Sequence, residues 1–172
     1  MTFKFKAINS SVYTIILVVS LTLFSSYTMA EDKITPAAGF TLKNQHGENI
    51  KLSELRGQVV LLNFWSSQCG TCIKQFSKLD KFHSQFSAKG LHILAINIGS
   101  DLKKITQISK KFNPKFSLLF DPYNVASTAY DIENLPTSFL IDRDGNIQNK
   151  LIEDNINDTQ KIQAIIQGLI NG

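Results

Sequence analysis

The stretch Val59-Val60-Leu61-Leu62-Asn63-Phe64-Trp65-Ser66-Ser67-Gln68-Cys69-Gly70-Thr71-Cys72 joins an apolar run to a pair of cysteines. The continuous apolar run over residues 59–65 predicts a strand that is buried on both faces. From residue 70 to residue 88 the apolar residues recur at steps of three and four, which is the period of an amphipathic helix. That period is carried by Phe76, Leu79, Phe82, His83 and Phe86. The sequence therefore predicts that both cysteines lie where a buried strand passes into a helix.

This position favours redox chemistry at Cys69. Unpaired backbone N–H groups and the positive end of the helix dipole stabilise a thiolate at a helix start. Such sites commonly lower the pKa of a cysteine from about 8.5 to about 7.5 or below. Cys72 lies one turn further along the helix, where more burial is expected. We therefore predict Cys69 as the nucleophile and Cys72 as the resolving thiol of a dithiol–disulfide couple.

Three other roles for the cysteine pair are weaker. A structural disulfide that closes a loop of about four residues stabilises by only about 2 kcal/mol, against about 4.7 kcal/mol for a loop of about 100 residues. A zinc site needs two further ligands, and His46, His83 and His92 show no paired spacing, so we expect no metal. Haem attachment needs a histidine directly after the second cysteine, where this chain has Ile73.

The remaining patterns predict an α/β domain with a central mixed sheet. Alternating or continuous apolar runs predict a small hairpin over residues 40–52, a strand at 91–98 and a short extended segment at 116–120. A second hairpin is expected over residues 137–151, around Asp144-Gly145. Helices are expected at 101–112, through Leu102, Ile105 and Ile108, at 125–130, and at 159–170 with Asn157 as its N-cap.

The first thirty residues have the pattern of a secretory signal peptide. Lys4 and Lys6 precede an apolar stretch over residues 12–24, and small residues lead to Ala30. We expect cleavage after Ala30, a tether over residues 31–38 and one domain over residues 39–172. An uncleaved anchor is the alternative, although a spanning helix wants about 20 apolar residues. The expected location is thus periplasmic or otherwise extracytoplasmic.

Composition excludes several other classes of protein. The chain has 172 residues, 43% hydrophobic and 19% charged, which is ordinary for a globular domain. Its 18 basic and 14 acidic residues are scattered, so no nucleic-acid partner is expected. Two cysteines are too few for a scaffold held by several disulfides.

Assembled in this order, the strand, the Cys-x-x-Cys pair and the helix resemble the thioredoxin superfamily. The closer likeness is to the extracytoplasmic TlpA/ResA-like thiol–disulfide oxidoreductases of the redoxin (AhpC/TSA-like) type. The segments that carry it are the signal peptide, residues 55–65 and Leu135-Pro136-Thr137-Ser138-Phe139-Leu140-Ile141-Asp142-Arg143-Asp144-Gly145. The resemblance covers nearly all of residues 36–170 and implies a thioredoxin-like fold with an added N-terminal hairpin.

The resemblance also implies roles for residues around the cysteines. Pro136 would be a cis-proline facing the pair, and the backbone of Leu135 and Thr137 would offer a strand edge to an incoming peptide. Trp65 would shield the active site, with plain core packing as the alternative. Gly70 and Thr71, between the cysteines, would shape the site.

The resemblance implies no cofactor, because the sulfurs carry the electrons themselves. The expected partners are protein thiols and disulfides and a membrane electron-donor protein, with the reducing direction favoured. Cytochrome c maturation is a possible setting that the sequence does not establish.

The chain departs from relatives at three positions. Thr71 stands where many relatives have proline. It restores an N–H donor near the sulfurs and lets the first turn move, which should alter the reduction potential in a direction that the sequence does not provide. Asn63 stands where thioredoxin itself has a buried acid, and Gln75 stands where ResA-like members often carry a glutamate. A buried carboxylate at such a site can tune the pKa of a thiol. Two alternative functions stay open: a thiol peroxidase, for which Ser66 fits but Asn63 replaces the expected proline, and a non-catalytic peptide-binding module.

Overall fold

The computed structural model describes residues 34–152 and 158–172. The expected signal peptide, with its cleavage point at Ala30, lies outside the described residues. Among the residues that are described, no helix combines the length and the apolar character needed to cross a membrane.

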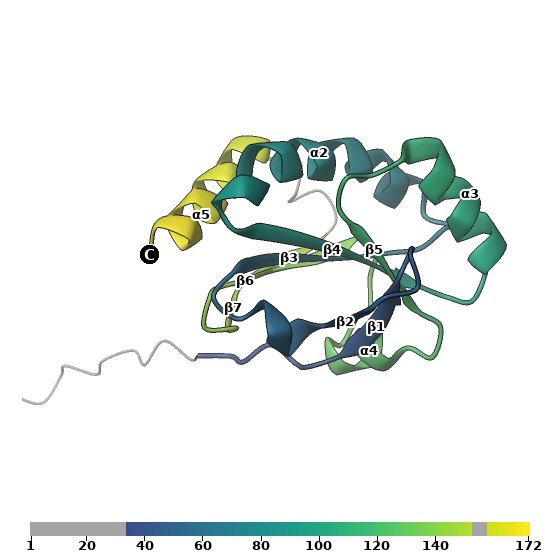
Figure 1. The fold of residues 1–172 in the computed structure, drawn as a ribbon, viewed down its shortest axis with the longest axis horizontal. Helices are drawn as coiled ribbons and strands as arrows, with labels where there is room; N and C mark the ends of the chain where they lie inside the picture. Colours follow the sequence, from purple (N-terminus) through teal and green to yellow (C-terminus); the bar gives the residue numbers. More distant parts are fainter. Residues whose placement is uncertain (1–33, 153–157) are drawn as a thin grey trace, which may run out of the picture. The chain divides into compact units, whose positions relative to one another are not determined.

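A seven-stranded mixed sheet forms the centre of the domain, in the order β2-β1-β5-β4-β3-β6-β7 (Figure 1). Strand β3 pairs parallel with β4 and antiparallel with β6, so the strand before the cysteines lies inside the sheet. The strands are β1 Thr41–Asn44, β2 Asn49–Lys51, β3 Val59–Trp65, β4 Leu91–Ile98, β5 Ser117–Asp121, β6 Thr137–Ile141 and β7 Ile147–Ile152. The helices are η1 Leu52–Leu55, α2 Gly70–Phe86, η2 Ser87–Lys89, α3 Leu102–Phe112, α4 Val125–Ala129 and α5 Thr159–Asn171.

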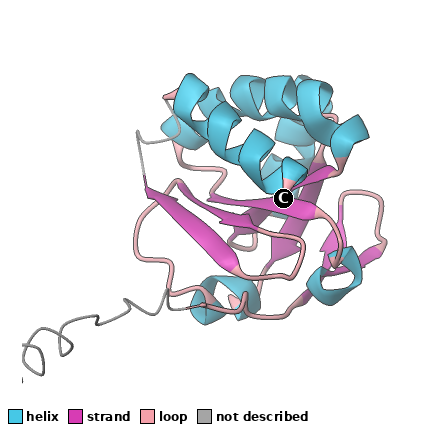
Figure 2. Ribbon diagram, turned by 90° about the vertical axis from the view of Figure 1, so that its left-hand side faces the viewer, coloured by secondary structure: helices cyan, strands magenta, loops and turns pink. Residues whose placement is uncertain are grey.

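Helices cover both faces of this sheet. Helices α2, α3 and α5 lie on one face, and α4 and η1 lie on the other (Figures 1 and 2). Every residue of β3 is buried, because its alternate side chains pack into two different apolar clusters. Leu61 and Trp65 face α2, whereas Leu62 and Phe64 face α4. The fold class and the mixed sheet predicted from the sequence are confirmed.

Two details of the helices differ from the sequence prediction. Helix α5 is capped by Asp158, whose carboxylate accepts a hydrogen bond from the Lys161 N–H at 3.1 Å, whereas Asn157 lies outside the described residues. Leu102, the first residue of α3, is 54% exposed, whereas Ile105 and Ile108 of the same helix are buried. The period of apolar residues predicts which face of a helix is buried, but it does not predict how far that burial extends toward the end of the helix.

The segment expected to be a tether is partly built into the domain. The Ala37 N–H donates to the Gly145 carbonyl at 2.9 Å, and Pro36 forms a bridge with Asn146. Ala37 is also buried, at 8% exposure. Residues 36–37 therefore close against the β6–β7 hairpin instead of leading freely into the fold.

Candidate active site

The two cysteines form a disulfide at the start of helix α2, directly after β3. Their Cα atoms are 5.3 Å apart. Cys69 is the N-cap of the helix, and its sulfur accepts a hydrogen bond from the Cys72 N–H at 3.2 Å. The turn before it is held by Cys69 N–H donating to the Ser66 carbonyl at 3.1 Å. The strand-to-helix position predicted for the pair is thus confirmed.

The two sulfurs differ in their access to solvent. Cys72 is 0% exposed and packs in the core with Phe76, whereas Cys69 is only partly buried. Gly70 is exposed and places no side chain beside the Cys69 sulfur. This arrangement favours reaction of the substrate with the Cys69 sulfur. The buried Cys72 sulfur is then available only for exchange with Cys69.

Thr71 contacts the accessible sulfur directly. Its Oγ1 lies 3.3 Å from the Cys69 Sγ. A disulfide sulfur carries no hydrogen, so the Thr71 hydroxyl is the donor in this state. A thiolate is a stronger acceptor than a disulfide sulfur, because charge-assisted hydrogen bonds are about twice as strong as neutral ones. Thr71 therefore favours the reduced, ionised form of Cys69.

The segment before β6 contains Pro136 and the two flanking residues that were expected to offer a strand edge to a substrate peptide. The peptide bond between Leu135 and Pro136 is cis, as the resemblance implied. Thr137, however, is 2% exposed and pairs with Phe64 of β3 on one side and Ile152 of β7 on the other. Because Thr137 already lies inside the sheet, it does not offer a free strand edge. Of the two expected flanking residues, only Leu135 precedes the ladder.

Trp65 lies within the core. Its side chain is 0% exposed and meets the Phe76 ring edge-to-face, with centroids 4.9 Å apart. It belongs to the same apolar cluster as Cys72. The burial favours the core-packing alternative: Trp65 forms part of the wall behind Cys72.

A set of uncharged polar residues lies on the sheet face beneath α2. Asn63 is 0% exposed, and its Nδ2 donates to the Ser138 Oγ at 2.9 Å. Asn97, on the neighbouring strand, is 1% exposed, and neither of its side-chain polar atoms has a hydrogen-bond partner among the described residues. Gln75 of α2 is also buried. Sequence reasoning missed Asn97 and Ser138, although a polar residue inside an apolar strand was a signal for both.

The histidines lie away from the sulfurs. His83 is near the C-terminal end of α2 and His92 near the N-terminal end of β4. Burial, and then the positive charge of His83, lowers the pKa of His92. Because His83 lies at the opposite end of α2 from Cys69, it is placed poorly for a proton relay to the disulfide. The described part of the chain also contains no group of three His, Cys, Asp or Glu side chains able to hold a metal ion.

Comparisons with known proteins agree with this geometry. The AhpC/TSA family model matches residues 34–150. Thiol-disulfide oxidoreductase ResA of Bacillus subtilis (strain 168) is 33% identical over 111 residues, which are 64% of this chain and 62% of that protein, slightly under two thirds of its length. The ResA of Bacillus thuringiensis subsp. konkukian (strain 97-27) is 30% identical, over 75% of this chain and 76% of that protein.

Solved structures give the same picture. A crystal structure of a putative thiol:disulfide interchange protein DsbE from Chlorobium tepidum has a TM-score of 0.71 and 31% identity. The match covers 78% of this chain and 98% of that chain. The residues matched by the family model include strands β1 to β6, the cysteine pair and the segment before β6.

Proposed function

Because this chain belongs to the AhpC/TSA family, and within the thioredoxin superfamily to its ResA-like thiol–disulfide oxidoreductases, we propose that it reduces disulfide bonds of protein substrates outside the cytoplasm. The observation that carries this proposal is the disulfide at the start of α2, with one accessible sulfur and one buried sulfur. Thr71 and the Cys72 N–H both point hydrogen-bond donors at the accessible sulfur.

The reaction balances with the two cysteines alone. The reduced Cys69 thiolate attacks one sulfur of a substrate disulfide, forms a mixed disulfide and expels the other substrate sulfur as a thiolate, which takes up a proton. The Cys72 thiolate then attacks the Cys69 sulfur, closes the Cys69–Cys72 disulfide and releases the second substrate thiol. Two electrons pass from the dithiol to the substrate, and no further cofactor is needed.

The proposed location and partner follow from the N-terminal segment and the redox balance. A signal peptide over residues 1–30 would export the domain, and an uncleaved segment would anchor it on the same side of the membrane. A reductant that works outside the cytoplasm must be reduced again after each turnover. We propose a dithiol-bearing membrane protein as that electron donor.

The reduction potential of the Cys69–Cys72 couple tests the proposed direction. We expect the pair to equilibrate in glutathione and dithiothreitol buffers, with a potential at or below that of thioredoxin, about −270 mV. Thiol trapping after equilibration measures it. A potential near that of DsbA, about −120 mV, would make the protein a disulfide donor instead. A pair that never equilibrates would favour the non-catalytic module, and rapid consumption of peroxide by the reduced protein would favour a thiol peroxidase.

Replacing Thr71 with valine should make this potential more negative by about 20 mV. Valine keeps the shape of threonine but removes a hydrogen bond that is stronger to the Cys69 thiolate than to the disulfide sulfur. We put the difference at about 1 kcal/mol, and 30 mV corresponds to about 1.4 kcal/mol for two electrons. The pKa of the reduced Cys69 thiol should rise at the same time. Thiol trapping and the ultraviolet absorbance of the thiolate measure both quantities.

Thr71→Ser is the matched control, because it keeps the hydroxyl and removes only the methyl group. Thr71 is exposed, so neither change should disturb the core. If Thr71→Ser shifted the potential as far as Thr71→Val does, the hydroxyl would not be the cause.

A further inference from the structure

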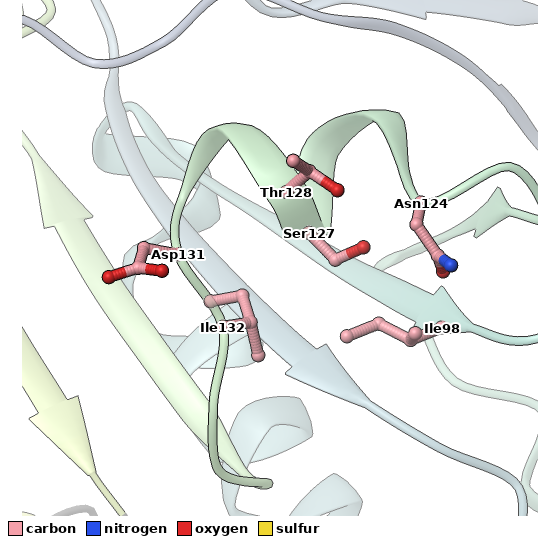
Figure 3. A pocket seen from close by; sticks show the side chains of 6 residues that line it. All are labelled: Ile98, Asn124, Ser127, Thr128, Asp131 and Ile132. Atoms are coloured by element: carbon pink, nitrogen blue, oxygen red, sulfur yellow. The ribbon is translucent and has the colours of Figure 1, made fainter.

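A second feature of the molecule lies beside the segment that leads to Pro136. It is a pocket of about 390 Å³ between helix α4 and the end of strand β4. Figure 3 shows its side chains, with the Ser127 hydroxyl on the α4 side and two isoleucines beneath it. The lining residues are Ile98, Asn124, Ser127, Thr128, Asp131 and Ile132.

The sheet places this pocket at the same end as the disulfide. Ile98 is the last residue of β4, and its neighbour Asn97 pairs with Trp65, the last residue of β3 before the cysteines. The Ile132 N–H donates to the Ser127 carbonyl at 3.1 Å, and the chain reaches Pro136 four residues later. The pocket and the disulfide therefore lie at the same end of the sheet, the pocket beside α4 and the disulfide at the start of α2.

The pocket contains an unused hydrogen-bonding group. Ser127 is 7% exposed, and its Oγ has no hydrogen-bond partner among the described residues. The Ser127 backbone N–H donates to the buried Asp121 carboxylate at 2.8 Å, so the hydroxyl is the group of Ser127 that lacks a hydrogen-bond partner among the described residues. A buried polar atom without a partner costs about 1–3 kcal/mol. An occupant that hydrogen-bonds this hydroxyl would recover that cost.

The lining favours a basic occupant. Asn124, Ser127 and Thr128 can both donate and accept hydrogen bonds, whereas Asp131 only accepts and carries a negative charge, and no lining residue is basic. No lysine, arginine or histidine occurs from residue 116 to residue 142, although the whole chain has more basic than acidic residues. Ile98 and Ile132 provide an apolar floor of the kind on which the methylene stem of a long basic side chain packs.

We propose that this pocket binds a lysine or arginine side chain of the substrate polypeptide, close in sequence to the disulfide that Cys69 attacks. The methylene stem lies on Ile98 and Ile132, and the charged end hydrogen-bonds the Ser127 hydroxyl in the field of the Asp131 carboxylate, which lies on the other side of Ile132 (Figure 3). The pocket thereby selects substrates with a basic residue beside the target cysteine. This inference rests on the proposed reductase function.

Disulfide-linked, fluorescence-quenched peptides test the inference with the reduced full-length chain. One set carries a single lysine at each position from four residues before to four after the cysteine, and a matched set carries norleucine, which keeps the stem but has no charge. In single-turnover stopped-flow measurements, lysine at one or two positions should raise the second-order rate constant about five- to tenfold over norleucine. The lysine-to-norleucine ratio is an internal control for any variant that folds less well.

Variants then locate the effect. Asp131→Asn and Ser127→Ala should bring the ratio close to one; asparagine suits the backbone at 131, where φ is 48°. Glu133→Gln removes the same charge two residues away, outside the lining, and should keep the preference for lysine.

Three results would overturn the inference. Equal rates for lysine and norleucine at every position would mean that the pocket does not select substrates, while the reductase function stands. An equal loss of preference in Glu133→Gln and Asp131→Asn would assign the effect to the general field of the acidic segment. If the wild-type chain reduced none of the peptides, that result would contradict the proposed disulfide-reductase function itself.

Discussion

Replacing Cys72 with serine should arrest the protein as a mixed disulfide between Cys69 and its substrate. The buried Cys72 thiol is the group that releases the substrate, so without it the first exchange proceeds and the second does not. Turnover of insulin reduction should fall to the rate of dithiothreitol alone. Non-reducing gel electrophoresis after acid quenching would show the trapped adduct as a band that reductant removes.

The matched variant, Cys69→Ser, should also stop turnover but should capture nothing. The remaining Cys72 thiol is 0% exposed in the core and cannot reach a protein disulfide without local opening of α2. Adducts formed through Cys72 instead of Cys69 would contradict the assigned order of the two sulfurs. Unchanged insulin reduction in both variants would contradict the reductase function.

Replacing Phe76 with alanine should lower the free energy of unfolding by about 3–5 kcal/mol. The Phe76 ring is 1% exposed and lies one helical turn after Cys72. It meets the rings of Trp65, Phe116 and Phe112 edge-to-face, with centroid distances of 4.9, 5.5 and 6.0 Å. Its removal should leave a cavity among these rings, and that cavity adds to the cost of the lost burial. Urea denaturation of the oxidised protein measures the change.

Tyr123→Ala is the control of similar size, because Tyr123 is 86% exposed. Its effect should stay within about 0.5 kcal/mol. A loss below about 1 kcal/mol for Phe76→Ala would mean that the aromatic cluster behind Cys72 repacks, and that this end of α2 is more plastic than its burial indicates.

Much of the domain could be predicted from the order of its residues, because the relevant signals are local. The run at residues 59–65, apolar except for Asn63, forms the central strand β3, and the Asp144-Gly145 turn joins β6 to β7. Exposed positions were harder to predict. Leu102 fits a helical apolar pattern but is 54% exposed, since the pattern does not show which elements pack against the first turn of α3.

The candidate site divides in the same way. The sequence by itself determined the two cysteines, their spacing and their position between a strand and a helix, since helix geometry and dipole act within one turn. Only the tertiary structure decided that Trp65 is enclosed by core rings and that Thr137 is paired on both sides. Only the tertiary structure likewise decided that Asn63 hydrogen-bonds Ser138 and that Ile98 lines a pocket together with residues of α4. These contacts join segments far apart in the chain, so they depend on strand order and register, which no local pattern of residues specifies.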